Sequence, residues 1–444
     1  MTPALVEAHA FGAQFVLPLP ISFYALGASA ALIASFAILS LWSKPEGLSK
    51  SLVKETNLPF PLKLEILLKL FGLLIFALTL LIAFFGSPAA PENLSLFVFW
   101  IGLLLIFPYI SVLVSGIWEK LDPFRFLSEL ALGKNYQPLL EFPPWLRYLP
   151  AILVYFAILY LELLSYGAGG IPYNIGLTLL LYLIVSVIGS GVFGVENWFC
   201  YGDFFSVFFR LCGLMAPLHL GEEKISVMAP GERLVSGRTR SFALLFFIFF
   251  ILAATAYDGF RETAPWFVIT TGNDFLVSWY STISLSALLI APCLFFLAYA
   301  VALYLMAKIS RYEGGSKALM LRYAYSLVPI ALAYNFAHYF TLILNEGQNL
   351  IPMLSDPLSR GWDLFGTATY TFRPDLISAT TTWYIEVVAI VIGHIFATYI
   401  AHRIALEEFQ TRKMIILAQL PMLILMVGYT SLGLWILSLP FGTS

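Results

Sequence analysis

The sequence predicts an all-α protein, a polytopic transmembrane helical bundle of about ten spans. Hydrophobic residues make up 60% of the 444 positions and charged residues only 11%, with a mean hydropathy of +0.87. Soluble domains carry about 25% charged residues, so this composition excludes an ordinary soluble fold. Apolar runs of about 20 residues, the length with which a helix crosses the bilayer core, recur along the chain. Basic residues gather in every second loop between these runs.

The polar segments between the apolar runs give the limits of the predicted spans. The spans lie at 20–43, 67–86, 94–117, 147–166, 174–194, 241–257, 283–307, 323–344, 380–402 and 414–437. Of the 24 lysines and arginines, 19 fall in loops after odd-numbered spans, whereas the opposite loops hold only Arg261, Arg360 and Arg373. Because short cytoplasmic loops are enriched in basic residues, we expect both termini to lie outside the cytoplasm.

No loop is long enough to fold separately, so we interpret residues 1–444 as a single integral membrane domain. An external segment covers 1–19. Two cytoplasmic segments, 118–133 and 196–218, each carry a carboxylate beside Trp or Phe and then an aromatic stretch with one arginine. They are typical of interfacial helices with an aromatic belt and a snorkelling arginine, or they form a cytoplasmic binding site. The external loop 345–380 is long enough to be a lid or binding element.

Ionisable side chains inside spans are rare and suggest function. This chain has six, namely Glu162, Asp258, His338, Glu386, His394 and His402. Counting along each span at about 1.5 Å per residue places the first four in the outer third of the bilayer. His9, in the external segment, could reach the same level.

Helical phase predicts which of these groups face the interior. Tyr334, His338, Thr341 and Asn345 share one face of the eighth span, and Ala389, Gly393, Ala397 and Ala401 share one face of the ninth. A stripe of small residues lets two helix backbones approach closely. Glu386 projects into the middle of that stripe and His394 lies at its edge. We therefore expect His338 and Glu386 to meet, and His402 to be an interfacial side chain.

Three interpretations of this cluster remain open. It is a hydrogen-bonded polar plug, an ion- or substrate-conducting path, or a metal or catalytic centre open to the outside. In the last case the ligands are His338, Glu386, Glu162 and Asp258, and the donors suit Zn²⁺ or Mn²⁺. Either Glu386 or Asp258 would then be ligand or general base. Haem is less suitable, because His338 and His394 differ in depth, and His394 and His402 share one helix.

The chain resembles the fenitrothion hydrolase family of bacterial multi-pass membrane proteins. The segments that carry the resemblance are 8–20, 122–125 (Asp-Pro-Phe-Arg), 194–198 (Gly-Val-Glu-Asn-Trp), 202–211, 257–260, 337–339, 355–366 and 383–394. The resemblance covers most of the chain, although none of these segments is a catalytic motif.

The resemblance implies a bacterial plasma (inner) membrane location and hydrolysis of a P–O–aryl bond in an organophosphorus triester. An apolar triester partitions into the outer leaflet, where a metal ion would activate water and polarise the phosphoryl oxygen. The alternatives are an ion- or proton-coupled transporter for small molecules, and a non-catalytic subunit of a larger membrane complex. The partners we expect are the lipid bilayer, a small apolar substrate and other membrane subunits, and no feature suggests nucleic acid.

Overall fold

The computed structural model describes residues 20–42, 54–59, 61–133, 135–221, 224–373 and 376–439. The chain is 78% helical, which confirms the all-α class. His9 and the predicted external segment 1–19 lie outside the described residues. Residue contacts divide the chain into two compact units. Unit 1 comprises Met1–Ala10, Leu52–Pro230 and Thr341–Leu376, and unit 2 comprises Phe11–Ser51, Gly231–Phe340 and Ile377–Ser444.

The protein is an integral membrane protein. Within the described residues, nine helical segments are long and apolar enough to cross a membrane: Ile21–Leu41, Leu62–Phe85, Leu94–Leu113, Pro172–Phe193, Phe242–Arg261, Tyr280–Ser310, Gly315–Ser355, Ala379–Glu408 and Arg412–Ser438. The predicted fourth span, 147–166, forms a helix of only 15 residues, Leu149–Leu163. That helix is roughly 22 Å long at 1.5 Å per residue, shorter than the bilayer core of about 30 Å.

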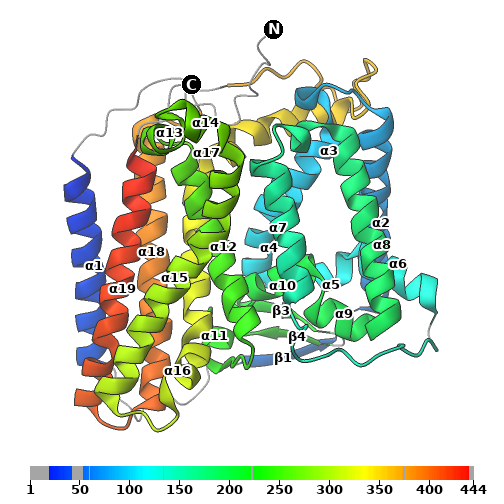
Figure 1. The fold of residues 1–444 in the computed structure, drawn as a ribbon. Helices are drawn as coiled ribbons and strands as arrows, with labels where there is room; N and C mark the ends of the chain where they lie inside the picture. The colour runs from blue at the N-terminus through cyan, green and yellow to red at the C-terminus, as the bar shows by residue number, and fades with distance from the viewer. Residues whose placement is uncertain are drawn as a thin grey trace. The chain divides into compact units, whose positions relative to one another are not determined.

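Unit 1 combines long apolar helices with short helices and a small sheet (Figure 1). Its helices are α2 (Leu62–Phe85), η1 (Ala90–Glu92), α3 (Leu94–Leu96), the π-helical stretch η2 (Phe97–Ile106), α4 (Phe107–Leu113), α5 (Ile117–Leu121), α6 (Pro123–Leu132), α7 (Leu149–Leu163), η3 (Ala168–Gly170), α8 (Pro172–Phe193), α9 (Val195–Tyr201), α10 (Phe204–Gly213) and the second part of α17 (Val328–Ser355).

The sheet of unit 1 has the strand order β1-β4-β3-β2. Its strands are β1 (Lys54–Pro59), β2 (Val114–Ser115), β3 (Leu218–Leu220) and β4 (Lys224–Val227). β4 pairs antiparallel with both β1 and β3, while β2 and β3 run parallel. β2 lies within the predicted third span, 94–117, whereas the other three strands lie outside the predicted spans.

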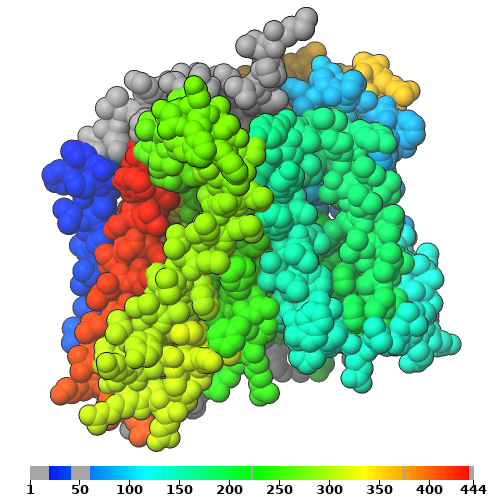
Figure 2. All heavy atoms as spheres, in the orientation of Figure 1, coloured from blue at the N-terminus to red at the C-terminus, as the bar shows by residue number. Residues whose placement is uncertain are grey.

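Unit 2 contains the remaining helices. They are α1 (Ile21–Trp42), α11 (Glu232–Ser236), α12 (Phe242–Arg261), α13 (Ala264–Thr271), α14 (Asp274–Ser278), α15 (Tyr280–Ser310), α16 (Gly315–Tyr323), η4 (Ala324–Leu327), the first part of α17, α18 (Ala379–Glu408) and α19 (Arg412–Ser438). Figure 2 shows α1, α19 and α15 side by side on one face of this unit. Their exposed side chains, such as Leu26, Leu294 and Ile424, are apolar, as expected for contact with lipid.

The helix α12 forms the core of unit 2. Its apolar span is 78% buried, a larger share than in any other candidate span. Phe247 and Phe249 are fully enclosed, and α12 packs along α15. A polar side chain near the end of α12 is therefore directed into the protein rather than into lipid. This position is the one that Asp258 occupies.

Candidate functional site

The outer polar cluster that the sequence predicts contains a direct contact between α12 and α17. The Nε2 atom of His338 lies 2.9 Å from Oδ2 of Asp258. The hydroxyl of Tyr339 donates a hydrogen bond of 2.8 Å to the same carboxylate oxygen. The rings of His338 and Tyr339 meet edge to face, with their centroids 4.5 Å apart. The structure thus joins two of the four predicted ligands and adds Tyr339, which the helical-phase argument had missed.

Close packing holds this cluster in place. Asp258 is only 2% exposed, and the His338 side chain is 10% exposed. A methyl group at Gly259 would lie 3.3 Å from Cε1 and Nδ1 of the His338 ring. The absence of a side chain at this position therefore allows the imidazole to rest on α12. One turn away on the same two helices, Asn335 donates to Thr255 over 3.4 Å.

Three neighbouring side chains offset the burial of the Asp258 carboxyl group. A buried carboxylate costs several kcal/mol unless hydrogen bonds and opposite charges compensate it. Here Oδ2 accepts from Tyr339 and faces His338, and Arg261 interacts electrostatically with Asp258. Such an imidazole–carboxylate pair fixes the orientation and tautomer of the ring. The His338 ring therefore has a defined orientation toward Oδ2 of Asp258.

The other two predicted ligands are Glu386 and Glu162. Glu386 is on α18 in unit 2 and is partly buried, and its predicted meeting with His338 stays a prediction. Glu162 is on α7 in unit 1, and its residue is exposed. Among the described residues, no group of three or more His, Cys, Asp or Glu side chains gathers closely enough to hold a metal ion. Zinc centres normally use at least three protein ligands, and the predicted Zn²⁺ or Mn²⁺ centre stays a prediction.

The small-residue stripe on α18 does bring two helices together. A methyl group at Gly393 would lie 2.2 Å from Cβ of Ala333 on α17. His394, beside it, is 2% exposed, and its Nδ1 bonds the carbonyl oxygen of Ile390 over 2.9 Å. His402 is buried rather than interfacial. Its ring packs on Phe36, and Nδ1 lies 3.3 Å from Oε1 of Gln419.

Segments 118–133 and 196–218 form short helices, and their aromatic side chains form part of the core of unit 1. Their predicted place at the membrane interface stays a prediction. Phe124, Phe204 and Phe205 are at most 1% exposed, and the rings of Phe124 and Phe205 stack. Arg125 bonds Glu129 and Glu196, and Arg210 donates to carbonyl groups near the end of α9. Each segment folds back on the unit because a short helix turns into a second one at a buried aspartate.

Those two aspartates form a second polar cluster. Asp122 caps α6 through the amides of Phe124 and Arg125, and Asp203 caps α10 through the amide of Ser206. The Ser206 hydroxyl also donates to Asp122 over 3.3 Å, so one serine bridges both carboxyls. Burial raises the pKa of Asp122 well above its usual value, and the charge of Asp203 raises it further. The sequence carried the signal, since Asp followed by an aromatic helix is an N-cap pattern.

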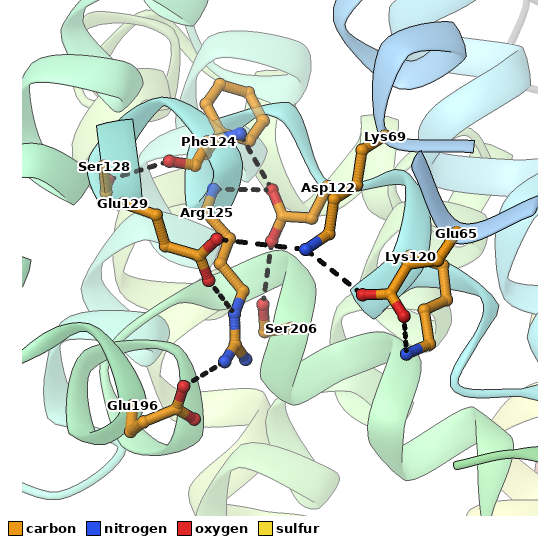
Figure 3. Close-up of polar contacts among 10 residues, drawn as sticks. All are labelled: Glu65, Lys69, Lys120, Asp122, Phe124, Arg125, Ser128, Glu129, Glu196 and Ser206. Carbon is orange, nitrogen blue, oxygen red and sulfur yellow. Dashed lines mark hydrogen bonds and ion pairs between the residues drawn. The ribbon is translucent and has the colours of Figure 1, made fainter. Parts of the chain in front are cut away.

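A chain of ion pairs surrounds Asp122 (Figure 3). Lys69 pairs with Glu65 and Glu129, and Lys120 pairs with Glu65 over 3.2 Å. Arg125 continues the chain to Glu196. Figure 3 shows these side chains coming from α2, α5, α6 and α9, so the chain ties four helices of unit 1 together. Because each charge already has a partner, the arrangement is that of a structural clamp.

The predicted outer loop begins later than expected. Residues 345–355 continue α17, and the irregular part starts after Ser355. Asp356 accepts from the amides of Arg360 and Gly361, and the Ser355 hydroxyl accepts from the amides of Phe365 and Thr367. These bonds give the loop a defined conformation, as the Ser-Asp-Pro turn predicts.

Comparisons with protein-family models, with curated proteins and with solved structures give no match. The functional argument therefore depends on the geometry of the described residues.

Proposed function

We propose that this protein is an enzyme of the bacterial plasma membrane whose acid–base centre is the His338–Asp258 pair. The substrate class is a small, apolar organophosphorus triester that enters from the outer leaflet. The observation that carries the proposal is the buried contact of 2.9 Å between His338 and Asp258, which Tyr339 supports from the same oxygen. The resemblance to the fenitrothion hydrolase family supplies the reaction, and the physiological substrate is a separate question.

The proposed chemistry follows from the hydrogen-bond directions. An ionised Asp258 carboxylate only accepts, so Nε2 of His338 carries a proton and donates it to Oδ2. The lone pair then lies on Nδ1, which removes a proton from water as the water oxygen attacks phosphorus. The P–O–aryl bond breaks, and the aryloxide leaves with the bonding electron pair. Asp258 stabilises the imidazolium that forms, as in other His–carboxylate pairs.

Turnover of a nitrophenyl phosphorothioate by purified protein in proteoliposomes tests this proposal. Wild-type protein should release nitrophenol, and His338→Gln should lower the rate by about 10²-fold or more, the usual contribution of a general base. His402→Gln is the matched control, because His402 is buried in the same unit but contacts Gln419 instead. Its activity should stay close to wild type. Folded wild-type protein without turnover would contradict the proposal.

A second candidate function, proton-coupled transport, is favoured by a different observation. Buried polar side chains continue along α18 as His394, Thr398 and His402, and Gln419 on α19 meets the last of them. Polar groups inside spans commonly mark ion or proton paths. Substrate-dependent acidification of liposomes, measured with an enclosed pH dye, would favour transport. A partner that co-purifies in fixed ratio would favour the role of a subunit in a larger membrane complex.

A further inference from the structure

A small cavity lies inside unit 2 between α12, α15, α17, α18 and α19. Its volume is about 20 Å³, enough for one water molecule. Most of its lining is apolar, and the polar groups come from three side chains, Tyr334, His394 and Tyr429. The hydroxyl of Tyr429 already donates to the carbonyl oxygen of Phe295 over 2.7 Å. The other two polar side chains, Tyr334 and His394, each place a buried polar atom whose hydrogen-bond partner has to be identified.

These two groups are Nε2 of His394 and the hydroxyl of Tyr334. Both atoms are buried and have no hydrogen-bond partner among the described residues. His394 is 2% exposed and Tyr334 is 4% exposed. A carbonyl group only accepts, so the contact with Ile390 places the ring proton of His394 on Nδ1. In the neutral ring Nε2 is then an acceptor, whereas the Tyr334 hydroxyl is able to donate.

Packing prevents either side chain from turning to another partner. The Tyr334 ring lies so close to Gly433 on α19 that a methyl group there would approach it to 2.9 Å. His394 is fixed by its bond to Ile390, one turn earlier on α18. Leaving a buried polar group without a hydrogen bond costs free energy, and proteins normally satisfy such groups with ordered water. The cavity has the volume and the polar groups for one such molecule.

We propose that Tyr334 and His394 form a binding site for a single water molecule. The water accepts a hydrogen bond from Tyr334 and donates one to Nε2 of His394, so that it links α17 to α18. Tyr334 precedes His338 by one helical turn, and Ile436 both lines the cavity and packs against Gly259 beneath the His338 ring. The proposed water site therefore continues the polar face of α17 by one helical turn, from His338 to Tyr334. It goes beyond the proposed hydrolysis and does not depend on it.

X-ray radiolytic labelling of the protein in nanodiscs, followed by mass spectrometry, tests the site. Radicals formed from a bound water oxidise the side chains that touch it. We expect oxidation of Tyr334 and Tyr429 several-fold faster than that of Tyr299, which is fully buried, does not line the cavity and donates to Met320. In the double variant Tyr334→Phe/His394→Leu, oxidation of Tyr429 should fall to the Tyr299 rate, because an apolar cavity stays dry. Equal rates in wild-type protein, or unchanged oxidation in the double variant, would overturn the proposal.

A double-mutant cycle provides an independent readout on the same variants. If one water joins the two side chains, Tyr334→Phe and His394→Leu should lower the thermal midpoint by amounts that do not add, the double variant losing little more than the worse single one. The control pair is Tyr299→Phe with His394→Leu, whose effects should add because Tyr299 does not line the cavity and its hydroxyl bonds Met320 directly. Additive losses in the Tyr334/His394 pair would contradict a shared water.

Discussion

At the scale of single residues, the proposed acid–base centre consists of Asp258 and the side chains that contact it. A carboxylate this deeply buried remains only where its environment compensates the charge. His338 and Tyr339 provide that environment from adjacent positions of α17, and both contact the same oxygen atom. Gly259 leaves room for the imidazole, because a methyl group there would approach the ring to 3.3 Å.

Gly259→Ala should lower turnover several-fold without unfolding the protein. The added methyl group would lie 3.3 Å from Nδ1 of His338, so the ring must shift by a few tenths of an ångström. Small displacements of a catalytic group reduce rates strongly. The measurement is the rate with a nitrophenyl phosphorothioate, together with the thermal midpoint. A variant with the full wild-type rate would show that Nδ1 is not the reacting atom.

As the pH rises, the stability of Asp122→Asn should fall less steeply than the stability of the wild-type protein. Burial, followed by the charge of Asp203, raises the pKa of Asp122 above its usual 3.8. The stabilising contribution of the neutral carboxyl is complete below pH 3.8 and is lost as the pH rises through the raised pKa. Asparagine keeps an N-cap oxygen without the titration. Thermal midpoints across this pH range should fall less steeply in the variant, and an identical slope would contradict a raised pKa.

Sequence reasoning identified some of these residues and missed others for physical reasons. Depth and helical phase were sufficient to single out His338 and Asp258, because ionisable groups in spans are few. The same counting could not show that Glu162 belongs to a different compact unit. It also left out Tyr339, since a tyrosine hydroxyl near the membrane surface carries no signal until its acceptor is known.

At the scale of helices, α17, which carries His338, packs closely against α18 at Gly393. Gly393→Ala should destabilise the protein by roughly 1–3 kcal/mol, the usual effect of overpacking. The new methyl group would lie 2.2 Å from Cβ of Ala333, so the helices must separate. Gly428→Ala on α19 is the matched control, because a methyl group there would meet nothing within 4 Å. Denaturant unfolding in micelles should give a lower free energy of unfolding for Gly393→Ala than for Gly428→Ala. Equal free energies would contradict the close contact.

A second helix-scale prediction concerns Arg322 on α16, whose side chain is 5% exposed. It donates to Glu408 over 2.8 Å and to Glu407 over 2.6 Å, both on α18. Arg322→Ala should cost on the order of 3–5 kcal/mol, because it leaves Glu408 buried without this partner. Arg238→Ala is the control, since Arg238 approaches the same carboxylate but is 67% exposed. It should cost about 0–1 kcal/mol. Similar losses would contradict the prediction.

The helices themselves were largely predictable, because hydrophobic length is the dominant signal in such a chain. The departures have identifiable causes. The helix α7 is shorter than the span predicted at 147–166, because it begins only after Tyr148, which has a left-handed conformation. The aromatic segments around Asp122 and Asp203 fold into the core because paired N-caps satisfy their polar groups, which composition alone did not reveal.

At the scale of the whole molecule, the charge pattern predicts the orientation in the membrane. Lys224→Cys and Arg360→Cys, each made in a variant without the native cysteines, should react oppositely with an impermeant thiol reagent added from outside. Both positions are exposed, so access depends on the side of the membrane. Position 360 should react in intact cells, and position 224 only after permeabilisation. Equal labelling in intact cells would refute the orientation.

The central claim is that His338 and Asp258 act as one acid–base unit, and a double-mutant cycle on turnover tests it most directly. His338→Gln and Asp258→Asn should each lower the rate by about 10²–10⁴-fold. The double variant should be no slower than the worse single variant, because residues that act as a unit are not additive. If the two losses multiply, or if either single variant keeps the wild-type rate, the His338–Asp258 pair is not the reacting centre.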